Sequence, residues 1–226
     1  MTPFFDDILP HPAGFDDGEL DLIHERAYIV RAYRRGLDHL VLRGAVRDQK
    51  PAGLYIPDDP EPMTMHHMIV DLRIAVPSLT IEEVDVRLHT HPHDECPGIE
   101  QAYQKLVGLS IARGFINKVR ELFGGPRGCT HTTALLQAMA PVAIQSMWSF
   151  RAAAAESEGI SPFGTEESRE ISIMANLNTC HVWAEDGELI PKLRAGGEME
   201  KPVWMQRRME ALGIDEQQVA FPARRG

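Results

Sequence analysis

Two neighbouring segments, residues 65–76 and 81–90, alternate apolar and polar residues and most constrain the fold of this 226-residue chain. In the second segment the alternation separates an apolar face from a polar one, Val84, Val86 and Leu88 against Asp85, Arg87 and His89. The four residues between the segments have a length suited to a hairpin connection. We therefore expect paired antiparallel strands with one core face, whose polar face can present His67 and His89 together.

Helical spacing replaces the strand alternation after Pro92 and Pro97. The pattern predicts a helix over residues 99–109, a second over 115–123 that stops at a Gly-Gly-Pro turn, and a long third helix over 130–155 kinked at Pro141. The predicted fold is α+β: an antiparallel sheet of hairpins packed against three helices, one long and kinked.

The length of the chain permits a single domain with appended ends. Residues 1–25 are rich in proline and acids, which predicts an N-terminal arm, and residues 26–195 are predicted to form a single α+β domain. Within that domain residues 178–190 are typical of a hairpin turning at an acidic Glu-Asp-Gly. Residues 196–226 are predicted to form a C-terminal helix, over 204–212, and a basic tail.

The formal net charge of -10 argues against nucleic acid as a partner, because such proteins carry a basic surface for the phosphates. Five arginines form a local exception that can hold an anionic group or remain a solvated face: Arg31, Arg34, Arg35, Arg43 and Arg47. No window has the length of a membrane span, and the first residues lack the pattern of a secretory signal. We expect a cytoplasmic protein with no membrane partner and with its three cysteines reduced.

Each of the three cysteines lies near histidine or acid, and these are the side chains that bind zinc or iron and act as nucleophiles. Cys129 precedes the long predicted helix, where unpaired N–H groups favour a thiolate, and His131 follows in its first turn. Cys129 is thus a candidate ligand or nucleophile. A buried structural cysteine under the glycine-rich turn is the alternative.

Two further clusters are less clear. The run from His89 through His91 and His93 to Cys96 can contribute one or two ligands, or be a solvated loop end. Adjacent residues of a strand point to opposite faces, so only one of Cys180 and His181 is expected to enter a shared site.

Several segments together resemble a bacterial family of domains of unknown function over about residues 28–195. They are Cys96-Pro97, the run from Tyr103 to Phe115, the Gly-Gly-Pro-Arg-Gly-Cys-Thr-His run that ends at His131, and Cys180-His181. The resemblance implies that the three cysteines, His131 and His181 belong to one pattern, which favours a joint site. The histidines at 89, 91 and 93 are not part of that pattern. Family members are associated with bacteria that degrade aromatic compounds and lipids, but the family implies no general activity.

The leading hypothesis is a cytoplasmic enzyme that binds zinc or iron and acts as a lyase or hydrolase on a small organic catabolite. The association of the family with aromatic degradation suggests an aromatic catabolite. The predicted metal ligands are Cys96, Cys129, His131, Cys180 and His181. A metal-free alternative uses Cys129 as nucleophile and His131 or His91 as general base, with an acid such as Asp94 or Glu95 orienting the imidazole. Another alternative is a non-catalytic metal or iron–sulfur scaffold. The sequence leaves open whether the protein forms a homo-oligomer.

Overall fold

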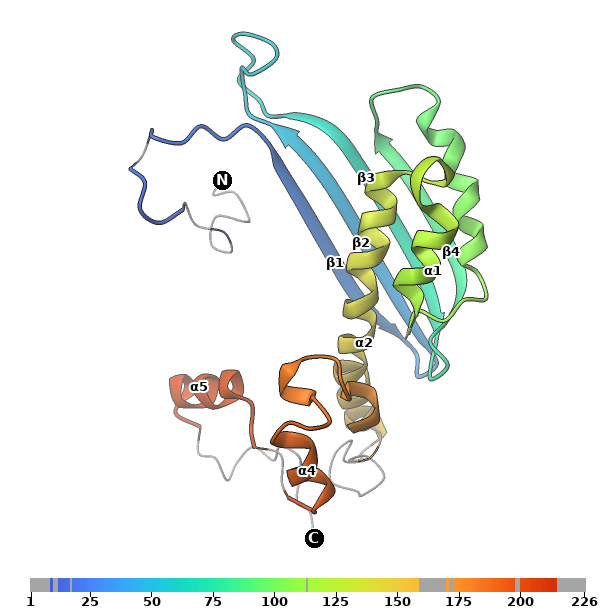
Figure 1. Ribbon diagram of the computed structural model, residues 1–226, viewed down its shortest axis with the longest axis vertical. Helices are drawn as coiled ribbons and strands as arrows, with labels where there is room; N and C mark the ends of the chain where they lie inside the picture. The colour runs from blue at the N-terminus through green and yellow to red at the C-terminus, as the bar shows by residue number, and fades with distance from the viewer. Residues whose placement is uncertain are drawn as a thin grey trace. The chain divides into compact units, whose positions relative to one another are not determined.

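A four-stranded antiparallel sheet forms the centre of the fold in a computed structural model of the chain (Figure 1). Its strands are β1 (Glu25–Arg35), β2 (His39–Lys50), β3 (Met63–Ala75) and β4 (Thr80–Thr90). They lie side by side in chain order, each antiparallel to the next. The predicted hairpin of the third and fourth strands is confirmed.

Alternation along the strands gives the sheet one buried face. The buried row comprises Leu40, Leu42 and Val46 of β2, Met68, Val70, Leu72 and Ile74 of β3, and Val84, Val86 and Leu88 of β4. The opposite face carries the polar residues that the sequence placed there, including His67 and His89, whose rings stack with centroids 5.3 Å apart. The predicted assignment of faces in the last two strands is therefore correct.

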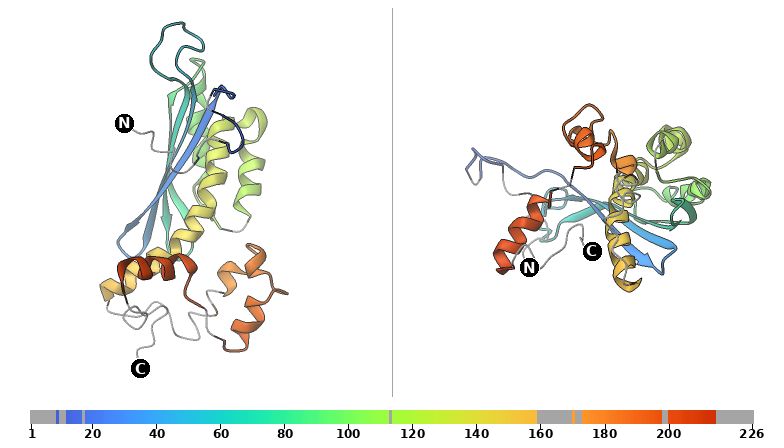
Figure 2. Two further views of the ribbon diagram at one scale, coloured as in Figure 1. Left: turned by 90° about the vertical axis from the view of Figure 1, so that its left-hand side faces the viewer. Right: turned by 90° about the horizontal axis from the view of Figure 1, so that it is seen from below.

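Three helical segments cover the apolar face: η1 (Cys96–Leu106), α1 (Phe115–Phe123) and the first part of α2 (Thr130–Glu158), as Figures 1 and 2 show. The α+β fold with three helices on the sheet is thus confirmed, and α1 has the predicted bounds. Pro141 lies inside α2 and removes one backbone donor there. The kink at this residue stays a prediction.

The first segment differs from expectation, because it is a 3-10 helix that begins at Cys96 and ends at Leu106. It runs along β4, the edge of the sheet. Leu88 donates its backbone N–H to Glu100 Oε1 at 2.7 Å, and the Gln104 amide donates to the Val84 carbonyl at 2.9 Å. These side chains satisfy edge groups that would otherwise be open to another strand.

Close packing between α2 and β2 depends on Gly44. A Cβ atom at this position would lie 2.7 Å from Met139 Sδ and 3.1 Å from Leu135 Cδ1. Both side chains are fully buried, so they have little room to move. The absent side chain lets α2 approach the sheet, and His131 lies one helical turn before Leu135 on the same face of the helix.

The structure describes residues 9, 12–16, 18–112, 114–158, 170, 173–197 and 200–214. The chain divides into two units, Met1–Ser146 and Met147–Gly226. The predicted arm and the predicted basic tail each lie partly outside the described residues. The predicted domain boundaries stay a prediction.

In the second unit the predicted hairpin over residues 178–190 is wrong. The chain instead forms η3 (His181–Trp183) and α4 (Leu189–Arg194), followed by α5 (Val203–Leu212), which confirms the predicted C-terminal helix. Asn178 closes the turn, since its N–H donates to the Trp183 carbonyl and its side chain accepts the Glu185 N–H. Ile190 and Leu193, at helical spacing, pack with Ile173 in a small core.

No helix in the described ranges combines the length and the apolar character needed to cross a membrane.

Replacing Gly44 by alanine should lower the free energy of unfolding by about 1–2 kcal/mol, because the added methyl group overpacks the contact with Met139 and Leu135. Urea unfolding measures the change. Gly98→Ala is the matched control, since a Cβ there meets no atom within 4 Å. Equal stability of the two variants would contradict the close packing of α2 on β2.

Candidate metal centre

Polar residues replace the apolar row at one end of the helix-covered face. Arg26 of β1 lies opposite Asp48 of β2, and Asp48 lies opposite His66 of β3. Because side chains alternate along a strand, Asp48 faces the same side as Val46, and His66 the same side as Met68. The three side chains therefore point toward the side of the sheet that carries α2.

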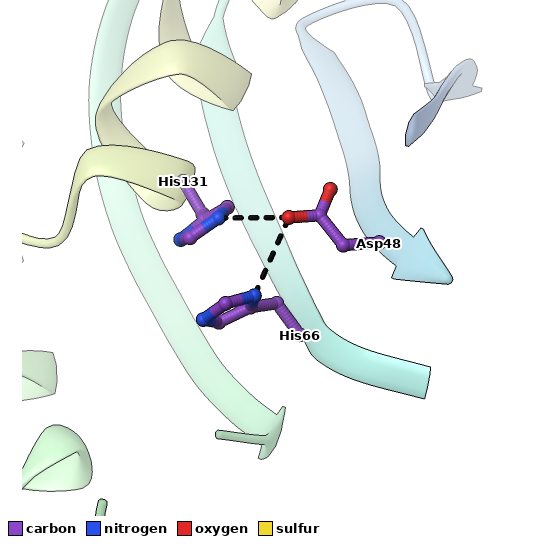
Figure 3. Close-up of side chains that lie close together, drawn as sticks. All are labelled: Asp48, His66 and His131. Carbon is purple, nitrogen blue, oxygen red and sulfur yellow. Dashed lines mark hydrogen bonds and ion pairs between the residues drawn. The ribbon is translucent and has the colours of Figure 1, made fainter. Parts of the chain in front are cut away.

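His131 completes the group from the first turn of α2. Its Nε2 lies 2.9 Å from Asp48 Oδ2, and its ring stacks on that of His66 with centroids 3.9 Å apart and an interplanar angle of 24°. Figure 3 shows both imidazole edges directed at the Asp48 carboxylate. We call Arg26, Asp48, His66 and His131 the Asp48 cluster.

Asp48 is 1% exposed and is the acid at the centre of this cluster. Arg26 donates from Nε to Oδ1 at 2.5 Å and from Nη2 to Oδ2 at 2.7 Å. Burial raises the pKa of the Asp48 carboxyl. The hydrogen bonds and charge of Arg26, with a smaller effect of His131, outweigh burial and lower the pKa to about 2. The carboxylate is therefore anionic throughout the neutral range.

The two histidines are suited to lone-pair donation. Burial and the neighbouring His66 lower the pKa of His131 more than Asp48 raises it, so the imidazole is neutral near pH 7. His66 Nδ1 lies 3.3 Å from Asp48 Oδ2, yet it is buried and has no hydrogen-bond partner. A buried nitrogen without a partner is unfavourable unless another species uses it.

Asp48, His66 and His131 can hold one metal ion, because each offers a ligand atom and these atoms lie within 4.8 Å of one another. Among the described residues this is the one group of three or more histidine, cysteine or acidic side chains with such a geometry. Two nitrogens and one carboxylate oxygen suit zinc or ferrous iron.

Cys129 lies on the other edge of the His131 ring, with Sγ 3.9 Å from Nδ1. Its backbone is held by the buried Tyr103, whose hydroxyl accepts the Cys129 N–H at 2.8 Å and donates to the Cys129 carbonyl at 3.3 Å. The carbonyl also accepts the Thr133 N–H, which starts α2. Gly128, directly before Cys129, packs closely against Phe123, since a Cβ at Gly128 would lie 2.6 Å from the Phe123 carbonyl oxygen.

The structure brings some of the predicted site residues together and not others. The structure brings Cys129 and His131 together, as expected. Cys96 begins η1 and lies outside the metal-binding group of the described residues. His91 binds within its own loop, where Nδ1 lies 2.8 Å from the His93 carbonyl oxygen.

Cys180 and His181 belong to the second unit, at the start of η3, and Cys180 is exposed. They are not on a strand, so the argument that only one of them can face a site loses its basis. Their convergence with Cys129 stays a prediction.

Asp48 and His66 are the functional candidates that the sequence reasoning missed. Asp48 and His66 meet only through the register between β2 and β3, and no local sequence pattern reveals that register. One signal was available: Asp48 continues the alternate row of Leu42 and Val46, so an acid stands in an apolar register.

The stability of the metal-free protein should depend on Asp48 at acid pH. The pKa of the folded state, about 2, is below the usual value, so the carboxylate stabilises the fold above about pH 4 and loses this effect as the pH falls through the folded pKa. Urea unfolding should show a loss of about 2 kcal/mol from this group between pH 5 and pH 2. Asp48→Asn should remove that part of the pH dependence, and Asp85→Asn, an exposed ion-pair residue, should retain it. An unchanged pH profile in Asp48→Asn would contradict the buried ion pair.

No curated protein and no solved structure matches the chain. A family model described as "Protein of unknown function (DUF2889)" matches residues 24–145, more than half of the chain. The match includes the whole Asp48 cluster and Cys129, and it ends before Cys180. The chain therefore belongs to the DUF2889 family, as the resemblance in sequence predicted.

Proposed function

We propose that this protein is a metal-dependent enzyme that binds zinc or iron through Asp48, His66 and His131 and acts as a hydrolase or lyase on a small organic compound. The observation that carries the proposal is the meeting of three donors from β2, β3 and α2 at one point, where His66 Nδ1 is buried without a hydrogen-bond partner.

The distances support an ion among these donors. Two ligand atoms about 2.1 Å from a common ion lie roughly 3.0–3.4 Å apart at octahedral or tetrahedral angles. Asp48 Oδ2 lies 2.9 Å from His131 Nε2 and 3.3 Å from His66 Nδ1. The carboxylate can still accept from Arg26, because its two oxygens offer about four acceptor positions.

The number of ligands favours catalysis over a structural role. Structural zinc sites are closed by four protein ligands, whereas catalytic sites use three and leave a position for water or substrate. A bound ion would supply Lewis-acid chemistry or an activated water, which suits hydrolysis and elimination.

The chain's own residues prepare this site. Arg26 holds the Asp48 carboxylate in place, and α2 presents the His131 ring over it. Cys129 Sγ stands where the Nδ1 proton of a metal-bound His131 would point, so the thiol side chain orients the ring as partners of ligating histidines do.

The candidate substrate is an aromatic catabolite, and the proposed location is the cytoplasm. The three free cysteines support a reducing compartment.

Replacing His66 by glutamine should lower zinc affinity by a factor of at least about 100, since one of three ligands is lost. His67→Gln is a close control, because the neighbouring His67 lies on the opposite face of β3 and stacks on His89. Dialysis against buffered zinc, followed by elemental analysis, measures both. Wild-type protein without stoichiometric metal, or equal zinc contents in the two variants, would remove the proposal.

A second candidate function is metal-free thiol catalysis. Cys129, His131 and Asp48 form a chain in which Sγ lies 3.9 Å from Nδ1 and Nε2 lies 2.9 Å from Oδ2. In this order the thiol is the nucleophile, the imidazole the base and the carboxylate the group that orients it. The predicted orienting acids, Asp94 and Glu95, are exposed loop residues, and Asp48 replaces them in this candidate.

Thiol catalysis predicts an activated Cys129. Iodoacetamide should then alkylate Cys129 at least tenfold faster than Cys96, which is also half-buried, and His131→Gln should abolish the difference. Mass spectrometry of timed samples gives both rates. Equal rates in the wild-type protein would exclude the nucleophile and leave the metal function intact.

A further inference from the structure

The solvent-facing side of the Asp48 cluster is formed by basic groups. The side chains of His24 and Arg26 are 39% and 34% exposed, whereas that of Asp48 is 2% exposed. His24 Nε2 approaches Asp48 Oδ1 to 3.9 Å from the segment before β1. A ligand entering from solvent therefore meets these bases before it meets the acid.

The cluster also lacks negative charge for a bound ion. Within the described part of the chain, the ion-pair contacts of His24, Arg26, His66 and His131 are all to Asp48. Arg26 already balances this single carboxylate, so a divalent ion would add two uncompensated positive charges. Such a centre favours a ligand that brings negative charge with it.

Arg26 has the geometry to bind that ligand. A guanidinium has five N–H donors, and Asp48 uses one from Nε and one from Nη2. The remaining donors include the edge formed by the two terminal nitrogens, which matches the two oxygens of a carboxylate. Tyr28 lies two residues along on the same face of β1, is 39% exposed and is a further hydrogen-bond partner of the Arg26 side chain through its hydroxyl, so a polar aromatic group stands beside the guanidinium.

We propose that the substrate of this centre carries a carboxylate, which Arg26 and His24 bind next to the metal ion. The inference rests on the proposed metal function and names the chemical class that the site selects.

Cobalt-loaded protein tests the two claims separately, because Co²⁺ reports its own binding and that of nearby ligands by visible absorption. Titration with benzoate should change the spectrum at concentrations at least tenfold below those needed for benzamide, which has the same shape without the charge. Arg26→Lys should weaken benzoate binding about tenfold, since it keeps the charge and loses the fork, and His24→Gln should weaken it several-fold. Arg47→Lys, on the opposite face of the sheet, should have no effect.

The outcomes separate the inference from the function on which it rests. If benzoate and benzamide change the cobalt spectrum equally, or not at all, the proposed substrate carboxylate is overturned and the proposed metal centre still stands. Phenyl phosphate binding tenfold tighter than benzoate also overturns it, in favour of a phosphate. Absence of any cobalt spectrum overturns both claims. If Arg26→Lys does not fold, His24→Gln and the comparison of the two wild-type titrations decide.

Discussion

The buried carboxylate of Asp48 links the sheet to its helices and sets the chemistry of the site. An isolated charge at 1% exposure would be strongly unfavourable, so Asp48 needs partners on every accessible side. Arg26 comes from the edge strand β1 and His131 from α2, so the single carboxylate joins two neighbouring strands to a helix that begins about 80 residues later in the sequence. The close approach of α2 at Gly44 makes this possible, because it brings the helix onto the sheet.

The His131 imidazole serves both candidate functions, but each function needs a different tautomer of the ring. A metal ion needs the lone pair of His131 Nε2, which leaves the proton on Nδ1 and directs it at Cys129. Thiol catalysis needs the lone pair on Nδ1, and Nε2 then donates its proton to Asp48. The two functions are therefore exclusive at any moment. The unpartnered His66 Nδ1 favours the metal, since a triad of Cys129, His131 and Asp48 has no use for a second histidine.

Local patterns were sufficient for much of the fold. The alternation of Val84, Val86 and Leu88 predicted a face of the sheet, and helical spacing between glycine stops predicted α1. The pair of Cys129 and His131 was also recognisable, because both residues belong to one helix start. Asp48 and His66 escaped prediction because 18 positions separate them in sequence and only the register of β2 with β3 brings them together. The segment after Cys180 was misread, since the acidic Glu-Asp-Gly run was taken for the turn of a hairpin, whereas here Asn178 closes a turn and the chain continues as short helices.

The position of a zinc ion in the Asp48 cluster can be located directly by anomalous diffraction at the zinc absorption edge in crystals of the zinc-loaded protein. The account predicts one anomalous peak about 2.0–2.2 Å from Asp48 Oδ2, His66 Nδ1 and His131 Nε2, with a further position open to solvent. A peak bound by Cys96, Cys129 or Cys180 instead, or no peak in the Asp48 cluster, would contradict it.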